Sequence, residues 1–244
     1  MGILRGYVFI ITGASRGLGR ELALHVTREG GKVTLVARNE NQLRDVARFA
    51  EGETLIVRAD VVNEEDVAEV VSRTIDEYGK IDVLINNAAI GQRSLHGEGH
   101  QVTDISYTDW RRILNVNLNG VFLFTRQVLP TMIEHGRGNI INVSSGAGKT
   151  GIPTWTPYVT SKWGLEGFTR SVALEYIERG INVNSLYPGG RVNTGFWRHL
   201  SNQKRKDLLP PTVLNNAAVL LARQGKGGVT GKSMTAKSWE NYLE

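Results

Sequence analysis

A tyrosine and a lysine stand four residues apart at Tyr158 and Lys162, and no other tyrosine in the chain has a lysine at this spacing. Residues i and i+4 share one face of a helix, so an ammonium group would lie near the phenol. A free tyrosine has a pKa of about 10, and a neighbouring positive charge lowers that pKa by favouring the phenolate. Such a tyrosine can act as a general acid or base on a substrate oxygen. Surface helices also carry such pairs, so other residues must decide whether Tyr158 and Lys162 are catalytic.

A glycine-rich segment lies between a short apolar run and a helical pattern, and it reads Thr12-Gly13-Ala14-Ser15-Arg16-Gly17-Leu18-Gly19. Glycines at such a turn let the backbone bend sharply and approach a phosphate closely. The helix that follows offers free N–H groups and a favourable dipole to an anion. The spacing G-x-x-x-G-x-G, in its strand–loop–helix context, favours a dinucleotide-binding loop over a turn without a ligand.

The same loop fits G-x-S-x-G, the nucleophile elbow of hydrolases, with Ser15 as the nucleophile. That interpretation requires an acid and a histidine downstream, and His199 is the only late histidine. A nucleophile elbow on the first strand is poorly placed, and Gly19 would have no role in it. We therefore rank a hydrolase below a dinucleotide-binding protein.

The end of the second predicted strand bears on the choice of dinucleotide. An acid about 20 residues after the glycines would hold the ribose hydroxyls of NAD, whereas this strand ends in Val36-Ala37-Arg38-Asn39. A guanidinium can bind a 2′-phosphate through paired hydrogen bonds, and Arg16 in the loop is a second candidate. The two arginines favour NADP(H), while Glu40 keeps NAD as an alternative.

Short apolar runs alternate with longer helical patterns along the chain. The predicted strands are mostly continuous in apolar residues, as expected when helices cover both faces of a parallel sheet: Tyr7–Thr12, Lys32–Ala37, Thr54–Asp60, Ile81–Asn86, Asn139–Ser144, Ile181–Leu186 and Ser233–Thr235. The predicted helices are Leu18–Glu29, Asn41–Ala50, Glu64–Tyr78, Thr108–Glu134, Trp155–Arg179 and Thr212–Arg223. This alternation predicts an α/β fold, a doubly wound Rossmann-type sheet of about seven mainly parallel strands.

No linker, composition break or internal repeat divides the 244 residues. We therefore expect one domain, 1–244, that both binds the dinucleotide and carries the catalytic residues. Two irregular stretches, Ile90–Tyr107 and Gly189–Pro211, follow predicted strands. Ligands bind beyond the carboxyl ends of the strands in such sheets, so we expect both stretches to border the substrate.

Composition excludes several classes of function. The chain has no cysteine, so disulfides, thiolate metal ligands and a cysteine nucleophile are excluded, and we expect no metal site. We expect a cytoplasmic location. No apolar run is long enough to cross a membrane. The net charge is +5, but the basic residues are scattered and match no nucleic-acid motif. The expected partner is a small molecule rather than nucleic acid or a membrane.

Together these motifs resemble the short-chain dehydrogenase/reductase family, in its compact single-domain branch. The resemblance covers nearly the whole chain, and its motifs occur in the family's order: Thr12-Gly13 through Gly19, Asp60-Val61, Asn86-Asn87-Ala88, Asn117, Ser144-Ser145, Tyr158 with Lys162, and Pro188-Gly189. It implies an NADP(H)-dependent oxidoreductase that interconverts a carbonyl and an alcohol by hydride transfer.

The resemblance also implies catalytic roles. Tyr158 would donate the proton in reduction, and Lys162 would lower the pKa of that tyrosine and bind the nicotinamide ribose. Ser145, 13 residues before Tyr158, would hold and polarise the substrate oxygen. Asn117 would support a water relay to the lysine.

Other matching positions would hold the cofactor. Residues after the third predicted strand would flank the adenine, those after the fourth the adenosine ribose, and those after the sixth the nicotinamide. The expected cofactor-binding residues are Gly13, Ser15, Arg16, Gly17, Leu18, Gly19, Arg38, Asp60, Val61, Asn87, Ala88, Ala89, Tyr158, Lys162, Pro188 and Gly189.

The sequence departs from the family pattern at three places. The stretch Ile90–Tyr107, which holds Arg93, His96 and His100, is longer than usual in the family. Ala89 stands where the family usually has glycine, and Gly190 with Arg191 moves Thr194 away from the place of a threonine that contacts the cofactor. The role of Thr194 is therefore left open. We expect aromatic side chains to form much of the substrate wall: Trp155, Tyr187, Phe196 and Trp197.

Two alternatives stand beside this function. A 3-oxoacyl-carrier-protein reductase would dock an acidic carrier with basic residues. Arg179 lies at one expected position, but Gly136 occupies the other, with Arg137 adjacent. A non-enzymatic NADP(H) sensor on the same fold would not need Ser145, Tyr158 and Lys162. A homo-oligomer, either a tetramer or a dimer, is typical of the family.

Overall fold

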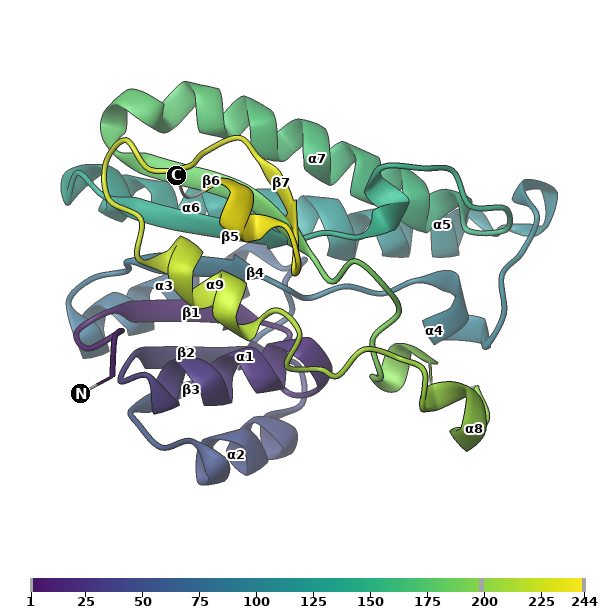
Figure 1. Cartoon of the computed structure of the whole chain (residues 1–244), viewed down its shortest axis with the longest axis horizontal. Helices are drawn as coiled ribbons and strands as arrows, with labels where there is room; N and C mark the ends of the chain where they lie inside the picture. Colours follow the sequence, from purple (N-terminus) through teal and green to yellow (C-terminus); the bar gives the residue numbers. More distant parts are fainter. Residues whose placement is uncertain (1, 198–199, 243–244) are drawn as a thin grey trace.

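Seven strands form one sheet in the order β3-β2-β1-β4-β5-β6-β7, and every neighbouring pair is parallel. The computed structural model describes residues 2–197 and 200–242. The chain winds outward from β1 to β3 and then returns to begin the other half at β4 (Figure 1). The strands are β1 Val8–Thr12, β2 Lys32–Ala37, β3 Thr54–Arg58, β4 Val83–Asn86, β5 Gly138–Val143, β6 Ile181–Tyr187 and β7 Ser233–Thr235.

Helices cover both faces of the sheet (Figure 1). The α-helices are α1 Gly17–Arg28, α2 Glu40–Phe49, α3 Glu64–Tyr78, α4 Gln92–His96, α5 Tyr107–Leu114, α6 Gly120–Glu134, α7 Thr156–Tyr176, α8 Asn202–Arg205 and α9 Asn215–Ala222. Short 3-10 or π segments are η1 Val102–Asp104, η2 Asn115–Asn119, η3 Gly146–Gly148, η4 Ile177–Arg179, η5 Gly195–Trp197 and η6 Trp239–Tyr242. Within the described ranges, no helix combines the length and the apolar character needed to span a membrane.

The sheet separates two apolar cores. Side chains alternate along a strand, so Phe9 and Ile11 of β1 pack toward α1, α2 and α9, whereas Ile10 packs toward α3, α6 and α7. Every residue of β1 is buried. Because helices exclude water from both faces, each strand can be apolar throughout, which is the pattern that predicts a parallel sheet.

A row of buried polar side chains crosses the middle of the sheet near the carboxyl ends of the strands. Asn86 Nδ2 on β4 donates to Asn142 Oδ1 on β5 at 2.9 Å. Asn142 Nδ2 donates in turn to Thr169 Oγ1 on α7 at 2.9 Å. Buried amides of this kind are stabilising only when they are paired, so the row fixes α7 against the two central strands.

The predicted strands are all present, with bounds moved by at most two residues, and the sheet is wholly parallel. One predicted helix is not continuous. The range 108–134 divides into α5, the π-helical turn η2 and α6. A π turn inserts an extra residue without interrupting the run of helical residues, so apolar spacing alone did not reveal it.

The two stretches predicted as irregular contain short helices. Residues 90–107 include α4 and η1, and residues 189–211 include η5 and α8. Each is only three to five residues long, too short to show a helical period. Both stretches extend from the same end of the sheet, beyond the carboxyl ends of its strands (Figure 1).

Candidate active site

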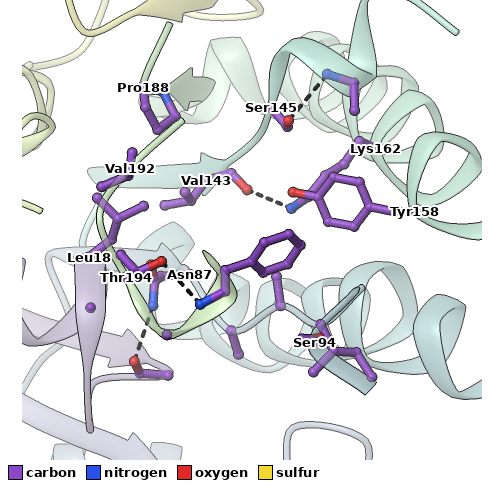
Figure 2. Close-up of a pocket in the computed structure, with 18 of the residues that line it drawn as sticks. Leu18, Asn87, Ser94, Val143, Ser145, Tyr158, Lys162, Pro188, Val192 and Thr194 are labelled. Carbon is purple, nitrogen blue, oxygen red and sulfur yellow. Dashed lines mark hydrogen bonds between the residues drawn. The ribbon is translucent and has the colours of Figure 1, made fainter. Parts of the chain in front are cut away.

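A cleft of about 1090 Å³ opens at the carboxyl ends of the strands. The lining residues come from the glycine loop after β1, the turns after β2, β3 and β4, helix α7 and the segments after β5 and β6. Figure 2 shows side chains of α7 and of the segments after β4, β5 and β6 around the cleft. This is where ligands bind in doubly wound sheets. The volume is slightly above the roughly 300–1,000 Å³ typical of sites for drug-sized molecules, so a dinucleotide and a second small ligand can share it.

Close packing against Asn87 explains the glycines of the loop. A Cβ on Gly19 would stand 2.4 Å from Asn87 Nδ2 and 2.4 Å from Gly13 O. Gly13 and Gly17 adopt φ angles of 66° and 58°, in the left-handed region that side chains disfavour. Asn87 Nδ2 donates to Thr12 O at 2.8 Å. The loop after β1 and the turn after β4 are therefore locked together.

The start of α1 is suited to an anion. The helix begins at Gly17, beside the cleft, and neither a side-chain cap nor an acidic residue occupies its first turn. Its first N–H groups are therefore available, and the positive end of the helix dipole faces the cleft. Ser15 and Leu18 line the same part of the cleft. A pyrophosphate group fits this arrangement of close backbone and free donors.

Two arginines lie at this end of the cleft. Arg38 follows β2 and has a side chain 63% exposed, with Nη1 3.8 Å from Asp60 Oδ2. Arg16 is also exposed and lines the cleft. Glu40, which kept NAD open as an alternative, instead forms an ion pair with Arg44 at 2.5 Å. Glu40 is not among the described residues that line the cleft.

Tyr158 and Lys162 lie one turn apart on α7, and both point into the cleft, near Ser145 (Figure 2). Lys162 Nζ donates to Val143 O at 2.8 Å and lies 5.7 Å from the centroid of the Tyr158 ring. The Ser145 side chain forms a hydrogen bond with the Tyr158 phenol. Ser145 Oγ also accepts from Ala147 N at 3.2 Å. The serine, the phenol and the ammonium group therefore converge.

Burial shifts the pKa values of Tyr158 and Lys162 in opposite directions. Loss of water raises the pKa of Tyr158 above its ordinary value, and the hydrogen bond from Ser145 opposes that effect. The pKa of Tyr158 is therefore raised, whereas the sequence predicted a lowered pKa. The reason is that burial outweighs the contacts that favour the phenolate. Burial also lowers the pKa of Lys162 to about 8, so this lysine is still largely protonated at neutral pH.

A buried carboxylate, Glu166, lies one further turn along α7. Its Oε1 accepts from Ser144 Oγ at 2.6 Å, and its Oε2 accepts from Ser185 Oγ at 2.9 Å and from Lys149 Nζ at 2.9 Å. These hydrogen bonds hold the pKa of Glu166 below its ordinary value against the opposing effect of burial. The resulting negative charge raises the pKa of Lys162 and so keeps that lysine charged.

Asn117 is fully buried, and its side chain joins two segments that border the site. Its Oδ1 accepts from Ile90 N at 2.8 Å, and its Nδ2 donates to Ile90 O at 2.8 Å and to Ser161 Oγ at 3.0 Å. These bonds fasten the start of the 90–107 stretch to α7, beside Tyr158. The water relay expected at Asn117 stays a prediction.

The segment after β6 closes over the other side of the cleft. The Thr194 side chain packs against Gly17, where an added Cβ would lie 3.2 Å from the threonine methyl group. Phe196 packs on Gly91, where an added Cβ would lie 2.8 Å from the phenyl ring. Thr194 therefore lies at the cofactor end of the cleft despite the shifted spacing, as Figure 2 shows.

The structure gathers nearly all predicted site residues around one cleft. Among them only Gly19 and Asn117 do not line it, because both act by packing behind it. Ala89, at the position of the family glycine, lies exposed on the cleft wall. Ser15 lies at the phosphate end, and the histidine required by the hydrolase hypothesis, His199, lies outside the described residues.

Sequence reasoning missed three supporting residues. Thr12 Oγ1 accepts from the backbone N of Asn87 at 3.0 Å and of Ala88 at 3.1 Å. Gly91 gives Phe196 room to pack. Glu166 is four residues after Lys162, which is a visible signal, but its serine partners on other elements are not visible in the sequence.

A parallel doubly wound sheet with this glycine loop and a converging serine, tyrosine and lysine defines a dinucleotide-dependent oxidoreductase. The sequence model described as short chain dehydrogenase matches residues 7–205, so the chain belongs to that family. It interconverts carbonyl and alcohol groups with a nicotinamide dinucleotide.

Similar proteins agree with this assignment. A 3-oxoacyl-[acyl-carrier-protein] reductase of Synechocystis sp. is 37% identical over 194 residues, which span 78% of this chain and 76% of that protein. Another, from Thermotoga maritima, is 39% identical over 76% of this chain and 74% of that protein. A crystal structure of 3-ketoacyl-(acyl-carrier-protein) reductase from Brucella melitensis complexed with NADH has a TM-score of 0.86 and 30% identity, covering 95% of this chain and 97% of that chain.

The packing behind the glycine loop yields a prediction. Gly19→Ala places a methyl group 2.4 Å from Asn87 Nδ2 and Gly13 O, so the loop must shift. Overpacking of this kind costs about 1–3 kcal/mol, and we expect the Kd for NADPH, measured by fluorescence titration, to rise roughly 5- to 150-fold. Gly167→Ala is the matched control, because an added Cβ there meets nothing within 4 Å. Equal affinities in both variants would contradict the role of this packing.

Proposed function

We propose that this chain is an NADP(H)-dependent carbonyl reductase or alcohol dehydrogenase in which Tyr158 transfers the proton. The observation that carries the proposal is the convergence of Ser145, Tyr158 and Lys162 in the cleft that begins at the glycine loop. The groups that would transfer the proton therefore lie in the same cleft as the loop that would bind the dinucleotide. We also propose that one domain, 1–244, performs both.

The residues of the cleft fit a dinucleotide. The glycine loop and the start of α1 would hold the pyrophosphate, and Asp60, Val61, Asn87 and Ala88 would line the adenosine part. Pro188 and Gly189, which also line the cleft, would line the nicotinamide. When it is bound, the nicotinamide supplies the hydride for reduction or accepts it in oxidation.

The hydroxyl groups of Ser145 and Tyr158 are hydrogen-bonded neighbours, so one substrate oxygen can contact both. In reduction, Tyr158 gives its O–H proton to that oxygen while Ser145 donates a hydrogen bond to it. The pKa of Tyr158 raised by burial keeps the phenol protonated before transfer. The ammonium group of Lys162, 5.7 Å from the ring centroid, favours the phenolate left after transfer.

The choice of NADP(H) rests on Arg16 and Arg38. Both are exposed at the cleft end that would take the adenosine ribose, and no acid follows β2 directly. The Nη1 of Arg38 is 3.8 Å from Asp60, a distance beyond a hydrogen bond, so its donors can turn to a phosphate. A 2′-phosphate is the group that two guanidiniums at this place would bind.

Assembly and location are part of the proposal. Trp163 and Leu174 are 52% and 77% exposed on α7, and their spacing of eleven residues puts them on one helix face. Phe122 on the neighbouring helix α6 is 45% exposed. Large apolar side chains exposed on one face of α7 support a homo-oligomer, a tetramer or a dimer. The absence of cysteine supports the cytoplasm.

A carrier-protein substrate has weaker support within one chain. Arg137 and Arg179 precede β5 and β6, at the amino ends of these strands, whereas the cleft lies at the carboxyl ends. Arg137 Nε also lies 3.7 Å from Asp82, and its guanidinium lies over the Tyr7 ring. The names of the relatives keep this substrate as the second candidate. It would require a neighbouring subunit to bring these arginines to a cleft.

Tyr158→Phe removes the proton donor and leaves the ring. General acid catalysis contributes roughly 10²–10⁴-fold, so we expect kcat for carbonyl reduction, followed by NADPH absorbance, to fall about 100-fold or more. NADPH titration shows whether the variant still binds the cofactor. Near-normal turnover would refute the proton-transfer role. Tight NADPH binding by the native chain, with no turnover across aldehydes, ketones and sugars, would favour the sensor alternative.

Arg38→Asp reverses the charge beside the expected 2′-phosphate. One charge-assisted interaction is lost and a repulsion replaces it, so we expect the preference for NADPH over NADH in kcat/KM to fall roughly tenfold or more. Arg44→Asp changes the net charge equally outside the cleft and should keep the preference. A native chain that uses both cofactors equally would remove the argument from Arg16 and Arg38.

The pH profile tests the link between Glu166 and Lys162. The pKa of Lys162 is lowered to about 8, and its charged form assists proton transfer, so kcat/KM should fall as the pH rises through about 8. Glu166→Gln removes the charge that raises this pKa, so the fall should begin at lower pH. The exposed Glu175→Gln on the same helix is the control. An unmoved profile in a folded Glu166→Gln variant would contradict the link.

A further inference from the structure

Aromatic rings from two separate segments surround the reactive phenol. Trp155, just before α7, lies 5.7 Å from the Tyr158 ring between centroids, and Phe196 of η5 lies 5.7 Å from the same ring. Trp197 completes the cluster at 5.6 Å from Trp155. All four line the cleft. Rings at these distances make favourable edge and tilted contacts, so the wall beside the proton donor is aromatic and apolar.

Two guanidinium groups lie over the outer rings of this wall. Arg93 of α4 has Cζ 5.5 Å from the Trp155 ring centroid, and Arg191, after β6, has Cζ 5.0 Å from the Trp197 ring centroid. Both arginines line the cleft. A guanidinium over an indole keeps its charge and can direct N–H groups from its edge toward an anion.

Negative charge is scarce at this end of the cleft. Among the described residues that line the cleft, Asp60 is the one carboxylate, and it lies after β3 with Arg38 as its neighbour. β3 is the sheet edge farthest from β6 and β7. Around the catalytic residues, the lining side chains that carry charge are Arg93, Lys162 and Arg191. The substrate end is therefore electropositive as well as aromatic.

From this wall we infer that the substrate is an aromatic or fused-ring carbonyl compound, or the corresponding alcohol, that carries a carboxylate group. This inference rests on the proposed function and specifies its substrate class. The rings stack against Trp155, Phe196 and Trp197, the reacting oxygen meets Ser145 and Tyr158, and the carboxylate pairs with a guanidinium. A neutral aliphatic substrate would offer neither a ring to the aromatic wall nor an anion to a guanidinium.

The test compares acids with amides of the same shape. Kinetics with NADPH are measured for 3- and 4-acetylbenzoate, for 6-acetyl-2-naphthoate and for the corresponding primary amides. We expect kcat/KM for at least one acid to exceed that of its amide roughly tenfold or more, because the amide has no charge for a guanidinium to pair. We expect Arg191→Gln or Arg93→Gln to lower this acid-to-amide ratio to about one. Arg223→Gln, on an exposed arginine outside the cleft, should keep it.

Several results would overturn the inference. They are a native ratio near one for every pair, a ratio that survives both arginine substitutions, or an aliphatic keto acid such as 4-oxopentanoate used as well as the aromatic acids. If Arg191 instead binds a cofactor phosphate, Arg191→Gln will raise the Kd for NADPH and leave the ratio intact. That result also rejects the substrate role of Arg191.

A binding measurement separates this inference from the proposed function. Calorimetric titration of the acids and amides into the NADP⁺-loaded Tyr158→Phe variant reports recognition without turnover. Preferential binding of an acid that is lost in the arginine variants supports the substrate class. If the native chain nevertheless turns over no carbonyl, the proposed function is rejected and the substrate class is not. If the native chain turns over small neutral ketones and neither the kinetic nor the binding assay shows a preference for the acids, the substrate class is rejected. That result does not contradict the proposed function.

Discussion

The site depends on keeping one ammonium group charged in a nearly dry interior. Lys162 is 3% exposed, and burying an unpaired charge is costly. Its hydrogen bond to Val143 O at the end of β5 and the nearby charge of Glu166 offset that cost only in part, since the pKa still falls to about 8. The position of α7 against β5 and β6 is thus tied to the protonation state of one lysine.

Glu166 must itself be stabilised, and this requirement extends across the sheet. Its oxygens accept from Ser144 after β5, from Ser185 in β6 and from Lys149 after η3. Ser185 Oγ in turn hydrogen-bonds Ser233 Oγ on the edge strand β7 at 2.8 Å. Ser144 directly precedes Ser145. The same buried carboxylate therefore supports the lysine electrostatically and holds the turn that presents Ser145.

The sequence predicts well those features that depend on neighbours along the chain. Apolar strands, the glycine loop and the Tyr158–Lys162 pair are local patterns, so the sheet and the main site residues follow from them. The contacts of Glu166 depend on the register of β5 and β6, and the Asn117 side chain in the π turn bonds to Ile90, which is 27 residues away along the chain. Neither has a local signature. The direction of the Tyr158 pKa shift was missed for the same reason, because burial is a property of the whole fold.

The two ends of the cleft differ in how they are built, and this difference explains why the cofactor is easier to infer than the substrate. At the dinucleotide end, the backbone of Gly13 and Gly19 packs closely against the side-chain amide of Asn87, which leaves no room for a side chain at either glycine. Its chemistry is fixed by the turns themselves. The substrate end is made of side chains on short helices, with Phe196 packed on Gly91 and arginines over tryptophans. A change of one ring or charge there alters the ligand while the sheet, the glycine loop and the proton donor stay the same.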